Sequence, residues 1–238
     1  MNQFAPALAP HAIDTAASAF ASDGHVRIEP VLDPGAAAGL GAFLADAAPW
    51  RRVMNQDEKT WDLDIGELQG LSGTQAEQMM KIIHDQACHG FQFLFDSVRV
   101  SEDPAERTAR GLPIDGLVSA FNTPQWLDLF RRLTGVAEIA MVDGQATRYL
   151  PGHFLTAHDD DVDGKNRVAA YVLNLTPEWR TEWGGLLQFH DGEGDVIRAL
   201  KPRFNALHLL KVPQVHSVSH VAPFAGGPRL SITGWLRR

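Results

Sequence analysis

The residues best suited to chemistry lie in one short stretch of the chain. Residues 149–160 read Y-L-P-G-H-F-L-T-A-H-D-D and place His158 and Asp160 two positions apart, directly after an alternating apolar run. On a β-strand such residues point to the same face with their Cα atoms about 6.6 Å apart, so an imidazole and a carboxylate placed this way can chelate one metal ion. Asp159 would point away under the same alternation, which favours Asp160 as the ligand. A run of three acids is, however, also typical of a solvated turn.

The His-x-Asp pair is a weak signal alone, and three later histidines compete to supply a second imidazole. His208 lies within an apolar strand, where we expect a core histidine whose hydrogen bonds are satisfied. His216 and His220 share one strand face, but they lie about 13 Å apart. Two imidazoles and one carboxylate on one side of a metal leave its opposite side open, and this is the ligand set of non-haem Fe(II) oxygenases.

A candidate anion-binding residue follows the histidines in the sequence. Arg229 lies thirteen residues after His216, inside the alternating segment R-L-S-I-T-G-W. A buried guanidinium presents a planar fork that suits bidentate capture of a carboxylate. Ser231 shares its face and could bond the same carboxylate. The alternative for Arg229 is an ion pair at the edge of a sheet.

The last ninety or so residues, from about Gln145 to Trp235, carry a series of motifs in order. These are Tyr149-x-x-Gly152, His158-x-Asp160, Asn174-Leu175-x-Pro177-x-Trp179, Trp183-Gly184-Gly185-x-Leu187, Pro202-x-Phe204-Asn205, His216-x-Val218-x-x-Val221 and Arg229-x-Ser231-x-x-Gly234-Trp235. The span resembles the double-stranded β-helix core of 2-oxoglutarate/Fe(II) dioxygenases, in particular the prolyl 4-hydroxylase-like branch. The H-D-D triplet and W-x-x-x-W-G-G are most similar to the enzymes that hydroxylate a proline in ribosomal proteins.

The resemblance implies an assignment for each part of the site. Fe(II) would be held by His158, Asp160 and His216, the last chosen because the family places a ligand at the start of H-x-V-x-x-V. The cosubstrate 2-oxoglutarate would be bound by Arg229, with Tyr149 and Ser231 close by, and ascorbate would serve as a reductant. The family also tends to place a tyrosine on the strand after the His-x-Asp turn. Tyr171 fills that place here, or Val172 if the register differs by one.

The reaction implied by the resemblance is hydroxylation of an unactivated C–H bond, with a prolyl residue of a protein or peptide as the substrate. A hydroxylase of a free amino acid or another small metabolite is the first alternative. A non-catalytic, cupin-like metal-binding protein is the second, and the motif around Arg229 disfavours it, because a metal site alone needs no cosubstrate anchor. A nucleobase demethylase is disfavoured by the net charge of −8 and by the lack of any Lys and Arg cluster.

The bulk properties fit an ordinary globular chain. The 238 residues are 45% hydrophobic and 21% charged, so one core with a helical extension can bury a sizeable interior. Cys88 is the one cysteine, which excludes an internal disulfide and favours a reducing compartment; we expect it to be a small buried residue of a helix. The sequence shows no secretory signal and no apolar run of about 20 residues. We therefore expect a cytoplasmic protein without a membrane or nucleic-acid partner; its oligomeric state stays open.

The pattern along the chain predicts an α+β fold with a jelly-roll core in residues 139–238 and a mainly helical region, 1–138, packed on it. Turn residues and alternation favour short strands over 167–175, 184–190, 195–200, 204–212, 216–221 and 229–236, besides an earlier one over 25–32. Helices are expected over 13–21, from Pro34, over 74–95 behind a capping box at Thr74, and from Pro124 to Gly135. Residues 101–116 read as an exposed connector that could close over a substrate. His153 and His190 flank turns and are expected at the surface.

Overall fold

The computed structural model describes residues 4–57 and 59–238. Within them the chain forms helices α1 (Pro10–Asp23), α2 (Pro34–Asp46), α3 (Ile65–Gln69), α4 (Gly73–Ala87), α5 (Pro104–Arg110), α6 (Pro113–Phe121) and α7 (Pro124–Thr134). Its strands are β1 (His25–Ile28), β2 (Arg51–Gln56), β3 (Lys59–Asp64), β4 (Phe93–Arg99), β5 (Met141–Val142), β6 (Gln145–Tyr149), β7 (Phe154–His158), β8 (Arg167–Asn174), β9 (Leu187–His190), β10 (Val196–Leu200), β11 (Ala206–Lys211), β12 (His216–Val218) and β13 (Arg229–Arg237).

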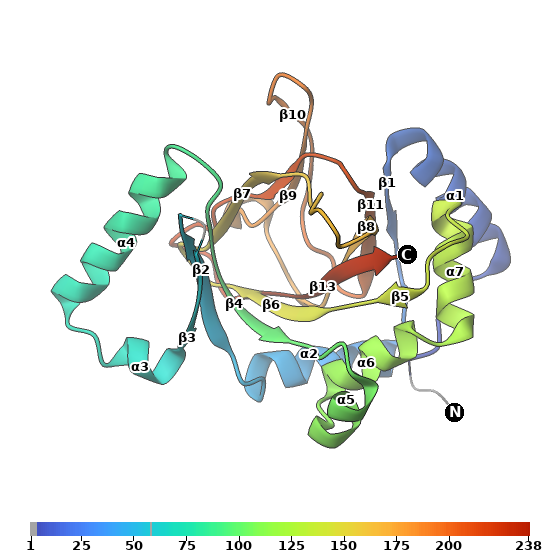
Figure 1. Ribbon diagram of the computed structural model, residues 1–238, viewed down its shortest axis with the longest axis horizontal. Helices are drawn as coiled ribbons and strands as arrows, with labels where there is room; N and C mark the ends of the chain where they lie inside the picture. Colours follow the sequence, from blue (N-terminus) through green and yellow to red (C-terminus); the bar gives the residue numbers. More distant parts are fainter. Residues whose placement is uncertain (1–3, 58) are drawn as a thin grey trace.

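The strands form one antiparallel sheet that curls on itself. Its order is β1-β11-β8-β13-β6-β4-β7-β12-β9-β10, with β2 and β3 added beside β4, and β5 beside β13. Figure 1 shows the sheet curling, with β7 and β9 on one side and β8 and β11 on the other; β12 lies between β7 and β9 in the strand order. This is the double-stranded β-helix that the sequence predicts, and the α+β fold class is confirmed.

The helices cover the outside of the sheet at two places. Figure 1 shows α1 and α7 beside β1 on one side and α3 and α4 beside β2 and β3 on the other. The side chains that α1, α2, α6 and α7 pack against the sheet form the largest core cluster, whose bulkiest members are Trp126, Phe121, Phe130 and Tyr171. This packing fixes the wall formed by β8 and β13. The helix from Pro34 begins as expected, because Asp33 accepts hydrogen bonds from the backbone N–H groups of Gly35 and Ala36.

The expected helix over residues 74–95 is wrong in its second half. The helix α4 ends at Ala87, its capping box is formed by Ser72 and Gln75, and residues 93–99 are the strand β4. The apolar residues from Phe91 to Phe95 satisfy both a helical and a period-two pattern, so periodicity alone could not separate the two. Pairing with β6 and β7 makes residues 93–99 a strand, because β4 lies between these two strands and completes their backbone hydrogen bonds.

The expected exposed connector over residues 101–116 is also wrong. It contains α5 and the start of α6, and α6 buries Ile114, Leu117, Val118 and Phe121. Pro104 and Pro113 are the first residues of these helices, where a missing N–H costs nothing. Two prolines that read as breaks in the sequence are thus helix starts.

The division of the chain at residue 138 stays a prediction. The sheet continues across it, since β1 pairs with β11 and β4 lies between β6 and β7. In the part of the chain that the structure describes, no helix is long and apolar enough to cross a membrane. Cys88 is exposed at the end of α4, contrary to the expected buried position.

Candidate active site

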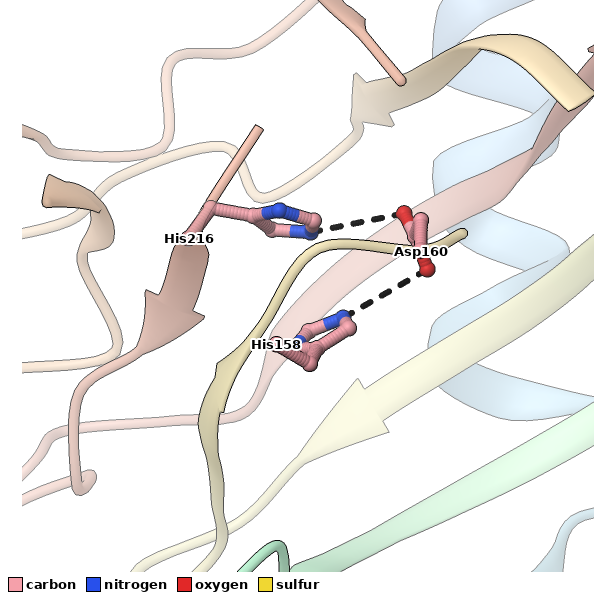
Figure 2. Close-up of side chains that lie close together, drawn as sticks. All are labelled: His158, Asp160 and His216. Atoms are coloured by element: carbon pink, nitrogen blue, oxygen red, sulfur yellow. Dashed lines mark ion pairs between the residues drawn. The ribbon is translucent and has the colours of Figure 1, made fainter. Parts of the chain in front are cut away.

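The structure brings His158, Asp160 and His216 together at one end of the curled sheet. His158 is the last residue of β7 and His216 the first of β12, and the two are directly opposite each other in the antiparallel pair. The Nε2 atoms of His158 and His216 lie 3.5 Å from the two carboxylate oxygens of Asp160, one on each side (Figure 2). One ligand atom from each residue lies within 4.8 Å of the others. Among the described residues this is the group suited to hold a metal ion.

Asp160 reaches this place by a turn and not by continuing the strand. The strand β7 ends at His158, and Asp160 has a left-handed backbone with φ of 63°. The expectation that both residues share a strand face is therefore wrong in its geometry, although the structure does bring their side chains together. Aspartate tolerates this conformation better than most residues.

The second nitrogen of each imidazole fixes its protonation. Nδ1 of His158 lies 3.0 Å from the carbonyl oxygen of Thr156, and Nδ1 of His216 lies 2.8 Å from that of Gln214. Because a carbonyl oxygen can only accept, each Nδ1 carries the proton, and each neutral ring turns a lone pair on Nε2 toward Asp160. Burial, more than the neighbouring His158, lowers the pKa of His216 to about 4.

Asp160 is held in its charged form. Burial acts to raise the pKa of Asp160, but its close contacts with His158 and His216 outweigh this effect, so the pKa falls below its usual value. Two nitrogen lone pairs and a carboxylate then converge within a few ångströms with no proton between them. Such a cluster of acceptors is stabilised by a cation.

A cavity of about 720 Å³ extends from these three residues to Arg229. One wall is a row of rings formed by Phe91, Phe93, Phe95 and Tyr149, whose successive centroids lie 5.7, 5.4 and 5.2 Å apart. The three phenylalanines were missed as site residues because their segment was expected to be helical. Their spacing of two residues is the signal that could have placed them on one face of a strand.

Arg229 lies in the cavity without a counter-charge. It is 1% exposed, its Nε and Nη1 atoms have no hydrogen-bond partner, and no ion pair involves it among the described residues. The Tyr149 ring lies 5.0 Å from its guanidinium carbon. Burial lowers the pKa of Arg229, yet an arginine stays protonated in proteins. A buried, unpaired guanidinium is costly, so this end of the cavity suits an anion.

Comparison with known proteins points to one superfamily. Residues 144–237 match the family model of the 2OG-Fe(II) oxygenase superfamily. Prolyl 3-hydroxylase OGFOD1 of Xenopus laevis is 35% identical over 119 residues, and that of Mus musculus is 30% identical over 118 residues. Each alignment covers 47% of this chain but only 22% and 21% of the relative, so the chain spans about a fifth of the length of the curated relatives it matches.

Solved structures agree on the fold over nearly the whole chain. A prolyl-4-hydroxylase of Pseudomonas putida superposes with a TM-score of 0.59 at 17% identity, covering 95% of this chain and 98% of that one. A prolyl hydroxylase of Trichoplax adhaerens, in complex with a hypoxia inducible factor peptide fragment, gives a TM-score of 0.60 at 16% identity and covers 95% and 89% of the two chains. Most of the described residues before 140 therefore share in the fold, although the sequence offers no motif there.

The superfamily implies Fe(II) and 2-oxoglutarate, and the residues present fit both. Two neutral imidazoles and one carboxylate on one side suit Fe(II) and leave its other side open. The unpaired Nε and Nη1 atoms of Arg229 suit the far carboxylate of 2-oxoglutarate. Ser231 is fully buried beside Arg229 on β13, and its Oγ lies 2.8 Å from Oγ1 of Thr147. Burial raises the pKa of Tyr149 to about 12, so its hydroxyl stays neutral in this pocket.

The other histidines lie away from the metal group. His208 is buried as expected, but its Nδ1 has no hydrogen-bond partner, so the expectation of a satisfied core residue is wrong. His220 stacks on Phe154 at 6.0 Å in a separate cavity of about 350 Å³. His153 was expected at the surface and is only 3% exposed. Burial lowers its pKa to about 4.

The choice between Tyr171 and Val172 is decided by the strand faces. Tyr171 packs its ring against Phe121 in the core below the helices, and its hydroxyl donates to the carbonyl oxygen of Asp143 at 2.9 Å. Val172 pairs with Thr233 on β13, which shares its face with Arg229. Val172 is thus the residue of β8 that shares a face with Arg229, while the Tyr171 ring packs into the core; both residues line the cavity.

Proposed function

We propose that this protein is an Fe(II)- and 2-oxoglutarate-dependent dioxygenase that hydroxylates an unactivated C–H bond of a prolyl residue in a protein or peptide. The observation that carries the reaction class is the pairing of two features in one cavity. A two-histidine, one-carboxylate cluster lies at one part of it and the buried, unpaired Arg229 at another. A non-catalytic metal-binding protein would need no buried, unpaired arginine beside its metal site.

The prolyl substrate is supported by the relatives. The two curated ones are prolyl 3-hydroxylases, and the structural neighbours include prolyl 4-hydroxylases, one of them with a peptide. The two groups are named for different ring carbons. The proposal therefore covers the prolyl residue and leaves the carbon to be measured.

Each group in the cavity has a defined task in this reaction. His158, Asp160 and His216 would hold Fe(II) by three positions on one side, and Arg229 would hold the far carboxylate of 2-oxoglutarate. When bound, the two supply the activation of O₂ that C–H hydroxylation requires, with ascorbate as a reductant. The wall of Phe93, Phe95 and Tyr149 keeps water away from the reacting atoms, which strengthens the electrostatic contacts inside.

A hydroxylase of a free amino acid or another small metabolite is the second candidate. The cavity volume of about 720 Å³ favours it, since this is a usual size for a small-molecule pocket and leaves room beyond the cosubstrate. The two candidates use the same iron and cosubstrate residues. They differ only in the substrate that enters the cavity.

One experiment separates them. Enzyme, Fe(II), ascorbate and 2-oxoglutarate are incubated with the protein fraction or the metabolite fraction of an extract from cells that lack the gene, with the His216→Ala variant as the inactive control. We expect succinate release with the protein fraction, together with a proline that gains one oxygen by mass spectrometry. Succinate release with the metabolite fraction alone, and no oxidised proline, would establish the second candidate.

A further inference from the structure

Arg167 lies directly against the carboxylate-bearing turn of the metal cluster. It is the first residue of β8, and its Nη1 donates a hydrogen bond of 3.1 Å to the backbone carbonyl oxygen of Asp160. The same atom lies 3.9 Å from the Asp160 carboxylate. Both side chains are mostly buried, with exposed fractions of 14% and 9%. One guanidinium thus contacts the backbone and the side chain of the same residue.

This contact falls where the backbone needs support. Asp160 has a φ of 63°, a left-handed conformation that L-residues adopt at a cost. Its carboxylate reaches both imidazoles only in this turn, because β7 has already ended at His158. A donor that fixes the carbonyl oxygen of Asp160 fixes the peptide plane that follows it, and so restricts the turn.

Arg167 is itself held by the neighbouring strand. Its guanidinium carbon lies 3.6 Å from the centre of the Trp235 ring. The backbone N–H of Trp235 donates to Asp143 at 2.8 Å, and Arg237 lies 3.4 Å from the other oxygen of Asp143. Trp235 belongs to β13, the strand that also carries Arg229. The stacking surface for Arg167 is therefore part of the rigid wall of the sheet.

We propose that Arg167 is a positioning residue for the metal ion, which sets the Asp160 turn so that the carboxylate meets both imidazoles. Arginine suits this task because its planar fork donates and stacks at the same time. Lysine keeps the charge and can donate a hydrogen bond, but it lacks the planar fork that donates and stacks at the same time. The proposal rests on the proposed function only in taking the cluster to be the metal site.

The test measures metal binding and needs no turnover. Apo-protein is titrated with Mn(II) and with Co(II), and the visible spectrum of the Co(II) form is recorded for wild type, Arg167→Gln and Arg167→Lys. Residues that orient metal ligands typically change affinity by about 10–100-fold. We expect a loss in that range for Arg167→Gln, a smaller loss for Arg167→Lys, and a shifted Co(II) spectrum in both. Arg198→Gln is the matched control and keeps wild-type values, because its half-exposed side chain lies against Asp23 and makes no contact with the cluster.

Unchanged metal affinity and an unchanged Co(II) spectrum in Arg167→Gln would overturn the proposal. If that variant also bound a substrate peptide more weakly, Arg167 would be a substrate contact. Should Arg167→Gln fail to fold by circular dichroism, Arg167→Lys carries the test with the same criteria. A wild-type protein that binds Mn(II) in an Arg167-dependent way, yet hydroxylates nothing, would overturn the proposed function and leave this inference intact.

Discussion

In the proposed function, three side chains from two strand ends and one turn would hold the metal, and each is oriented before a metal binds. Both imidazoles bond a carbonyl oxygen through Nδ1, so their Nε2 atoms point at the same place. Asp160 stays charged between them. Fixing the rings in one orientation removes most of the conformational entropy that metal binding would otherwise cost.

The first prediction concerns which histidines bind iron. Alanine at His158, Asp160 or His216 is expected to lower the iron affinity by more than about 100-fold, beyond the usual effect of residues that merely orient ligands. Alanine at His208 or His220 should leave the iron content unchanged, because neither lies in the cluster. Metal content after dialysis, measured by emission spectrometry, decides between them. Loss of iron in the His220 variant with retention in the His216 variant would reverse the assignment.

At the scale of elements, β4 joins the two halves of the sheet and lines the cavity. Phe93, Phe95 and Arg99 of this strand line the cavity. The buried Asp96 pairs with Arg52 and Arg148 on the neighbouring strands β2 and β6. Phe95 stacks on Tyr149, which in turn lies beside Arg229. One strand therefore lines the cavity beside Arg229 with its aromatic residues, and its Asp96 joins it to the two neighbouring strands.

The second prediction tests this placement. Phe95→Ala is expected to lower the free energy of unfolding by about 3–5 kcal/mol, since the ring is 8% exposed and packed on Tyr149. Phe91→Ala should change it by less than about 0.5 kcal/mol because that ring is 50% exposed at the mouth of the cavity. Urea denaturation of both variants measures the difference. Equal effects would contradict the assignment of this segment to a strand with Phe95 inside.

The strand β4 also marks a limit of what the sequence predicts. The strands after residue 139 follow from alternation and turn residues, and the site residues follow from motif spacing, as with His158 and Arg229. Residues 88–99 could not be placed, because their apolar spacing fits helix and strand alike and only pairing with β6 and β7 decides. The Asp160 turn and the unpaired state of His208 were equally out of reach, since both depend on long-range packing.

On the scale of the whole molecule, the interior holds histidines that cannot take up a proton easily. Burial is the largest cause in each case and lowers the pKa of His153 to about 4, of His208 to about 3 and of His216 to about 4. The ordinary pKa of a histidine side chain is 6.5. In the unfolded chain these histidines would become protonated as the pH falls below about 6.5, whereas in the folded protein they stay neutral until about pH 4. A fall in pH through this range therefore favours the unfolded state.

The third prediction follows from the sign of these shifts. The stability that the neutral histidines confer is fully present above about pH 6.5 and is lost as the pH falls toward 4, by up to about 1.4 kcal/mol per pH unit for each histidine. Denaturation of the apo-protein at pH 7, 5.5 and 4.5 measures this loss. His153→Gln is expected to reduce the slope. A free energy of unfolding that does not change between pH 7 and 4.5 would show that these residues are not buried in the neutral form.

The central claim is that one cavity holds a metal at His158, Asp160 and His216 and the far carboxylate of 2-oxoglutarate at Arg229. The most direct test is calorimetric titration of the Mn(II)-loaded protein with 2-oxoglutarate, comparing wild type, Arg229→Gln and the control Arg198→Gln. Loss of one partner of a buried, charge-assisted pair costs about 2–5 kcal/mol, or from about 30-fold to several thousandfold in affinity. We predict a loss of this size in Arg229→Gln, with Mn(II) affinity and the control unchanged. Wild-type affinity for 2-oxoglutarate in Arg229→Gln would contradict the claim.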